Sequence, residues 1–142
     1  MGIDPGSTAT GFGVVERHGP ELRHVAHGTL RPGRGVALPE RLAALLSGLC
    51  EVIEEHAPGV VVVERVFVAK SARSALVLGQ ARGVALAAAA SRALAVREYA
   101  PSQIKQAVVG TGSASKPQVQ AMVTTLLGLA QEPARDAADA LA

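Results

Sequence analysis

Aspartate is the rarer acidic residue of this chain, and each aspartate lies at a position where it could take part in catalysis. The chain has 142 residues and 12 acidic side chains, of which only three are aspartates: Asp4, Asp136 and Asp139. Asp4 directly follows a short apolar run, and Asp136 and Asp139 are three residues apart, so that a helix would carry both on one face. Glutamates occupy the ordinary surface positions. We therefore expect the aspartates to have a specific task.

A fourth carboxylate, Glu64, ends a run of four valines at residues 60–63. A charged group at the tip of such an apolar strand must be solvated, paired or bound to a metal ion. If this strand lies parallel to the first strand, Glu64 and Asp4 are neighbours, and the last helix could present Asp136 and Asp139 to them. Four converging carboxylates repel one another unless cations neutralise them. Ligands that are all oxygen favour Mg²⁺ or Mn²⁺ over zinc.

This set of residues predicts hydrolysis of a phosphodiester. Two such ions, about 3.5–4 Å apart, can clamp the phosphate, activate a water molecule and stabilise the leaving oxygen without a covalent intermediate. Each residue also has an ordinary interpretation when taken alone. Asp4 could shape a turn, and Asp136 could be a favourable charge at a helix N-terminus. Three aspartates and a strand-end glutamate together are harder to explain in that way.

The elements that must position these residues follow from the hydrophobic pattern. We expect strands over residues 1–3, 11–17, 22–30, 60–63 and 95–99. We expect helices over residues 38–53, 74–94, 102–109, 115–129 and from about 133 to the end. Three strands in hairpin order followed by alternating helices and strands predict an α/β fold, a five-stranded mixed sheet flanked by helices. No repeat or linker divides residues 1–142, which predicts a single domain.

The composition indicates the class of protein and the compartment in which it works. Apolar residues make up 49% of the chain, which argues against disorder, and no apolar stretch is long enough to span a membrane. No signal peptide is visible, and the single cysteine, Cys50, suits a reducing compartment. We therefore expect a cytoplasmic protein. The four histidines have no zinc-binding spacing and are expected at the surface.

The Ala-rich helix over residues 74–94 has a smooth face. Gly79 and Gly83 lie one turn apart on it, and small residues continue beyond them. Such a face permits close backbone approach. It could pack flat on the sheet of the same chain, or against the same helix of a second subunit.

Four sequence blocks carry a family resemblance. They are GIDPGS-x-x-TG-x-G, VVVERVFVAKSARSALVLGQARG, YAPSQIKQAVVG-x-G-x-A-x-K-x-QVQ and DAADALA. In this order and spacing the chain resembles the RuvC family of Holliday-junction resolvases over essentially its whole length. The resemblance implies a ribonuclease-H-like fold, a homodimer, and Mg²⁺-dependent nicks placed symmetrically across a four-way DNA junction during recombination and repair. It also implies cooperation with a branch-migration motor.

The resemblance assigns roles residue by residue. Asp4, Glu64, Asp136 and Asp139 match the family's acidic tetrad, expected to be both catalytic and metal-binding, with two Mg²⁺ ions for which Mn²⁺ could substitute. The residues expected to bind DNA are Phe67, Lys70, Arg73, Lys105 and Lys116. Phe67 matches an aromatic that is pushed against the junction centre, where stacking on a base contributes about 1–3 kcal/mol. Lys105 and Lys116 match two functional lysines that could hold a phosphate. Lys105 could instead lie on a solvated helix face, and Lys116 could be an ordinary residue at a helix N-terminus.

Three other classes of protein are alternatives to a resolvase. An ATPase of the actin and sugar-kinase type would need two large lobes and a second phosphate loop. A non-catalytic junction-binding module would not need the intact carboxylates. Another ribonuclease-H-like nuclease, acting on RNA–DNA hybrids or RNA precursors, would lack a use for the aromatic loop.

The family also has more apolar residues before GIDPG and a longer last helix, so the first strand could be weakly held.

Overall fold

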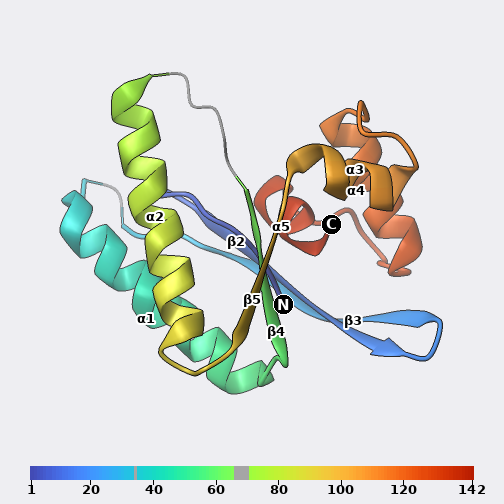
Figure 1. The fold of residues 1–142 in the computed structure, drawn as a ribbon, viewed down its shortest axis with the longest axis horizontal. Coiled ribbons are helices and arrows are strands. Elements are labelled where there is room, and N and C mark those ends of the chain that lie inside the picture. The colour runs from blue at the N-terminus through green and yellow to red at the C-terminus, as the bar shows by residue number, and fades with distance from the viewer. Residues whose placement is uncertain (34, 66–70) are drawn as a thin grey trace.

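A five-stranded mixed sheet forms the centre of the structure, a computed structural model that describes residues 1–33, 35–65 and 71–142 (Figure 1). The strand order is β3-β2-β1-β4-β5. The strands are β1 (Gly2–Asp4), β2 (Thr10–His18), β3 (Glu21–Leu30), β4 (Val60–Glu64) and β5 (Ala95–Tyr99). β1 is antiparallel to β2 and parallel to β4, so the short first strand is central and paired on both sides.

Helices cover both faces of this sheet (Figure 1). They are α1 (Leu38–His56), α2 (Ala72–Ala90), α3 (Pro101–Val109), α4 (Lys116–Leu126) and α5 (Arg135–Leu141). α1 and α2 lie together on one side, and α3, α4 and α5 lie on the other. The predicted fold class, a five-stranded mixed sheet flanked by helices, is confirmed.

Two apolar clusters hold these layers together. The larger one joins the sheet to α1 and α2, with Val61 and Val63 of β4 fully buried against the alanines of α2. The smaller one joins α4 and α5 to the opposite face, around Val119, Val123 and Leu141. The small side chains of α2 let it lie close to the strands, which is why so alanine-rich a helix can still form part of a core.

Two helices end several residues earlier than expected. α2 ends at Ala90 rather than near residue 94, because the chain turns through Ala93, whose φ is +53°. α4 ends at Leu126 rather than near residue 129, because Gly128 adopts a left-handed φ of +59°. Neither change moves a predicted site residue out of its element. Within the described parts of the chain, no helix is long and apolar enough to cross a membrane.

Candidate active site

Asp4 and Glu64 end two neighbouring parallel strands. The register pairs Gly2 with Val62 and Ile3 with Val63. Continuing that register by one residue places Asp4 beside Glu64, at the edge where both strands finish. Because β1 and β4 are held in place by their buried valines and isoleucine, the two carboxylates have rigid supports. The expected neighbourhood of Asp4 and Glu64 is what the structure contains.

α5 lies directly on β1 and β2 because glycines face it. A Cβ atom added to Gly11 would lie 1.8 Å from the carbonyl oxygen of Asp136, and one on Gly2 would lie 2.0 Å from that of Ala140. No side chain fits in either gap, so only glycine permits this approach. The contact fixes the height of α5 above the sheet. It thereby brings Asp136 and Asp139 towards the ends of β1 and β4.

The loop after Asp4 is closed by Thr10. This threonine is 1% exposed; its hydroxyl donates to the carbonyl oxygen of Gly6 over 2.8 Å and accepts from the Gly6 amide over 3.2 Å. A buried hydroxyl with two backbone partners is fully used in a structural role. Thr10 therefore fixes the turn that follows Asp4, although the sequence marked it only as part of the GIDPGS-x-x-TG block.

The carboxylates of the site act on one another electrostatically. Burial, and then the charges of Asp139 and Glu64, raise the pKa of Asp4 to about 7. Burial and the charge of Asp139 also raise the pKa of Glu64. Asp139 therefore lies near both Asp4 and Glu64, whereas Asp136 acts on Asp4 alone and less strongly. Strongly raised pKa values of clustered carboxylates are typical of functional sites.

Two basic side chains pair with the aspartates of α5. The Lys116 ammonium forms an ion pair and hydrogen bond with Asp139. That hydrogen bond raises the pKa of Lys116. Nη2 of Arg31 donates to Oδ2 of Asp136 over 3.1 Å. No local pattern singles out Arg31, which follows the end of β3 and meets Asp136 only because the fold joins positions 105 residues apart.

Of the other residues expected to bind DNA, only Lys105 and Arg73 lie within the part of the chain that the structure describes. Lys105, on α3, lies near enough to Glu64 to oppose the rise of its pKa. Arg73, in the first turn of α2, lines a small cavity of about 300 Å³ with Ser7 of the loop after Asp4. Lys105, Lys116 and Arg73 therefore border the acidic site or the loop beside it. Phe67 and Lys70 lie outside the described residues.

The donor atoms suit a hard divalent cation. In the described ranges, no group of three or more His, Cys, Asp or Glu side chains is arranged to enclose a metal ion. Mg²⁺ does not need such a cage, because it keeps several waters and binds through one or two carboxylates and the phosphates of its substrate. Asp4 and Glu64 provide oxygen ligands whose mutual repulsion a cation would relieve. The residues present therefore fit Mg²⁺ or Mn²⁺.

Comparison with known proteins agrees with this geometry. The family model "Crossover junction endodeoxyribonuclease RuvC" matches residues 1–142. A protein of that name from Citrifermentans bemidjiense is 51% identical over all of this chain and 87% of its own length. One from Pseudomonas aeruginosa is 54% identical over all of this chain and 81% of its own.

Solved structures give the same result. The structure titled "T. thermophilus RuvC in complex with Holliday junction substrate" is 35% identical and superposes with a TM-score of 0.92, covering 99% of this chain and 86% of that one. The yeast mitochondrial resolvase Ydc2, at 16% identity and a TM-score of 0.68, shares the fold. RuvC structures have a ribonuclease-H-like fold, which confirms that expectation too. The chain belongs to the RuvC family of crossover junction endodeoxyribonucleases.

Proposed function

We propose that this endodeoxyribonuclease resolves four-way Holliday junctions by paired, symmetric, metal-dependent nicks. Family membership over the whole chain supports the class of reaction. The observation that carries the proposal is the placement of Asp4 and Glu64 side by side at the ends of β1 and β4, with Asp139 of α5 close enough to raise the pKa of both. The relative that was solved in complex with a Holliday junction substrate supports the choice of substrate.

Each carboxylate has a proposed place in the site. Asp4 and Glu64 form its shared centre, and Asp136 and Asp139 complete two ion positions. Mg²⁺ is the expected ion, and Mn²⁺ the expected substitute. When bound, such ions supply an activated water and stabilise the leaving oxygen. The chain itself holds the carboxylates in position through the strand ends and through the contact of α5 with Gly2 and Gly11.

The basic residues around the site are proposed to hold the DNA. Lys116 and Lys105 border the carboxylates and can reach a phosphate there, which would also balance charge that builds during hydrolysis. A metal ion held by Asp139 would compete with Lys116 for that carboxylate, and the ammonium could then hold the phosphate. Arg73, Lys70 and Phe67 are proposed to contact the junction near its centre, with Phe67 stacking on a base. Arg31 is proposed to orient Asp136.

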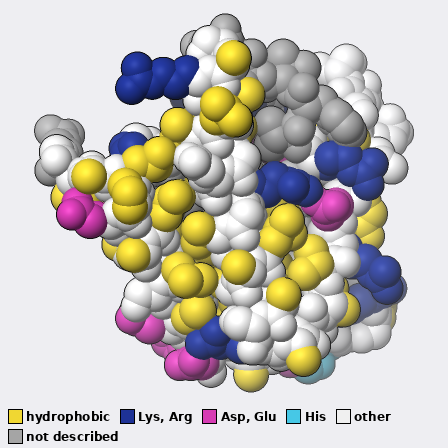
Figure 2. Space-filling model, turned by 60° about the vertical axis from the view of Figure 1, so that its left-hand side comes forward, with side chains coloured by type: hydrophobic (Ala, Val, Ile, Leu, Met, Phe, Trp, Pro, Cys, Tyr) yellow, Lys and Arg dark blue, Asp and Glu magenta, His cyan; other side chains and the backbone are white. Residues whose placement is uncertain are grey.

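A homodimer would supply the two active sites that paired nicks require. The two interpretations of the smooth α2 face differ in whether it packs inside the chain. Gly79 and Gly83 are exposed, and no atom lies within 4 Å of a Cβ built on either. Leu76, on the same helix, is 70% exposed. Figure 2 shows hydrophobic side chains spread over this side of the molecule. These observations favour a second subunit's helix as the partner of this face.

The resemblance also implies a branch-migration motor as a partner, and this too is a proposal. A motor that moves the junction would bring preferred cleavage sequences to the dimer. Its binding could be tested separately from cleavage, by co-sedimentation of the purified proteins on junction DNA.

Cleavage of a synthetic mobile four-way junction tests the proposed function. The substrate is incubated with Mg²⁺, Mn²⁺ or chelator, beside linear duplex and RNA–DNA hybrid of the same sequence. We expect symmetric nicks in the junction alone, which chelator abolishes. Cutting of the hybrid in preference to the junction would assign the chain to another ribonuclease-H-like activity, and binding without cutting under either metal would leave a junction-binding module.

A further inference from the structure

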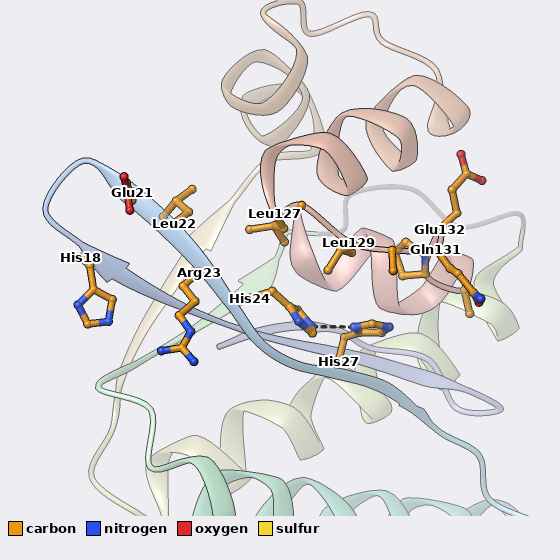
Figure 3. A pocket seen from close by; sticks show the side chains of 14 residues that line it. His18, Glu21, Leu22, Arg23, His24, His27, Leu127, Leu129, Gln131 and Glu132 are labelled. Carbon is orange, nitrogen blue, oxygen red and sulfur yellow. Dashed lines mark hydrogen bonds between the residues drawn. The ribbon is translucent and has the colours of Figure 1, made fainter.

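A second cluster of ligating side chains lies on the β2–β3 hairpin, apart from the acidic residues. Nε2 of His24 is 2.8 Å from Nδ1 of His27, and the two ring centroids are 4.9 Å apart. Figure 3 shows both rings side by side on β3, facing a groove that is closed on the other side by the segment joining α4 to α5. The groove has a volume of about 910 Å³.

A β-bulge brings these two histidines together. Residues three apart on a regular strand point to opposite faces of the sheet. Here, however, Val14 pairs with Ala26 and Val15 pairs with His24, so that Val25 is an extra residue in β3. His27 pairs with Gly13, two residues before Val15 on β2. Because Gly13 and Val15 share a face, their partners His27 and His24 share it as well.

We propose that His24 and His27 form a binding site for a borderline transition-metal ion, Cu²⁺ or Ni²⁺ first and Zn²⁺ second. Imidazole nitrogens at about 2.0–2.1 Å from one ion lie about 2.9 Å apart when they meet at a right angle, and about 3.4 Å apart in a tetrahedron. The observed 2.8 Å, which is also a hydrogen-bond distance, is short enough for both nitrogens to bind one Cu²⁺ or Ni²⁺ ion at a right angle. Zinc needs a small rotation of either ring.

The surroundings suit a cation. Burial, and then the neighbouring His27, lower the pKa of His24, which keeps its ring in the neutral form that binds metals. The charged residues lining the groove are two glutamates, Glu21 and Glu132, and one arginine, Arg23. The groove is open, so water or a carboxylate can take the remaining coordination positions. Two protein ligands imply moderate affinity and an ion that exchanges.

The ordinary explanation of the pair is a hydrogen bond between one neutral ring and the other. Both explanations need the bulge, and they differ only in whether a metal binds. Selectivity separates this site from the acidic one, because Mg²⁺ prefers oxygen ligands and leaves imidazoles vacant. Cu²⁺ that is bound through imidazole nitrogen in the presence of excess Mg²⁺ therefore reports on the histidines.

Titration of the untagged, full-length protein with Cu²⁺ under excess Mg²⁺ tests the proposal, with electron paramagnetic resonance to count the nitrogen ligands. We expect one ion per chain with a two-nitrogen signature, and binding at least tenfold weaker in both His24→Ala and His27→Ala. His56→Ala is the matched control outside the groove. His18→Ala removes a third imidazole that lines the same groove but contacts Glu16 over 2.9 Å. Both controls should bind as the wild type does.

A second measurement separates loss of the site from loss of the fold. Ni²⁺ should raise the Tm of the wild type and of the controls, by mass action on the folded state, but not that of either hairpin variant. The metal-free variants should unfold at nearly the wild-type temperature, since His24 is half-buried and His27 is exposed. Wild-type affinity in His24→Ala or His27→Ala would overturn the proposal, as would a wild type that binds no better than the double variant. Either result would leave the pair as a hydrogen bond.

Discussion

Asp4 lies in an environment that disfavours its negative charge. Its pKa is raised to about 7, from an ordinary value of 3.8, by burial first and by the neighbouring carboxylates second. Between these two values the folded chain keeps a proton that the unfolded chain has lost. Folding stability therefore falls as the pH rises from about 4 towards 7. The raised pKa of Glu64 acts in the same direction.

This linkage predicts a pH-dependent effect of Mg²⁺ on the Tm. At pH 8 the site is ionised and self-repelling, so added Mg²⁺ should stabilise the fold clearly. At pH 5 protons already occupy the site, and the shift should be small. Thermal unfolding with and without Mg²⁺ at both pH values measures this difference. Asp4→Asn removes a ligand and the repulsive charge, so added Mg²⁺ should raise its Tm much less at pH 8. If Mg²⁺ raised the Tm of the wild type equally at the two pH values, the account would be contradicted.

Arg31 is expected to matter for cleavage more than for stability. Its side chain is 62% exposed and that of Asp136 is 35% exposed, and exposed ion pairs contribute at most about 1 kcal/mol. Arg31→Gln should therefore change the free energy of unfolding by less than about 1 kcal/mol. Cleavage should nevertheless slow about tenfold, equivalent to about 1.4 kcal/mol of activation energy, because Asp136 loses its orientation.

Denaturant unfolding and single-turnover cleavage measure the two effects of Arg31→Gln. Arg31→Lys, which keeps the charge but not the planar group, is the matched variant and should recover part of the rate. A variant that loses several kcal/mol of stability, or one that cuts at the wild-type rate, would show that Arg31 does not orient the site.

At the scale of elements, the packing of α5 on the sheet is the contact that assembles the site. Gly11→Ala places a methyl group only 1.8 Å from the Asp136 carbonyl oxygen. Overpacking of this kind costs about 1–3 kcal/mol of folding stability. We expect α5 to be displaced, with a lower Tm and loss of cleavage even at high Mg²⁺. Gly59→Ala is the control, because nothing lies within 4 Å of its added Cβ. Normal cleavage by Gly11→Ala would mean that the height of α5 is unimportant.

Most elements could be predicted from the sequence because their local signals agree with the fold. The four valines of β4, the apolar stripe of α1 and the proline near its start are sufficient to place those elements. Helix ends were less certain, since the left-handed turns at Ala93 and Gly128 depend on packing and backbone conformation. The neighbourhood of Asp4 and Glu64 could also be anticipated, because both follow apolar strands.

Contacts between distant segments could not be predicted in this way. Arg31 meets Asp136 across 105 residues of sequence, and nothing local marks either residue as the other's partner. His24 and His27 were expected at the surface without metal-binding spacing. One extra residue in β3, Val25, puts both on the same face. A bulge is a property of the pairing with β2, so the sequence of β3 alone does not reveal it.

At the scale of the whole molecule, the proposed dimer makes a prediction about α2. Leu76 is 70% exposed, beside the open surface of Gly79 and Gly83. Leu76→Glu should place a charge in the subunit interface and yield monomers, measured by sedimentation. Such monomers should lose coordinated double nicking of a junction while keeping their fold. Leu126→Glu, at a residue 51% exposed on α4, is the control and should stay dimeric; a dimeric Leu76→Glu would place the interface elsewhere.

The most direct test of the central claim compares junction binding and junction cleavage in the wild type and Asp4→Asn. If the four carboxylates bind the ions that cut DNA, Asp4→Asn should lose cleavage with Mg²⁺ and with Mn²⁺. It should bind the junction as tightly as the wild type or more tightly, since a negative charge facing the phosphates is gone. Glu51→Gln, an exposed substitution on α1, should leave both properties unchanged. Cleavage by Asp4→Asn at a rate near that of the wild type, or loss of its junction binding, would contradict the account.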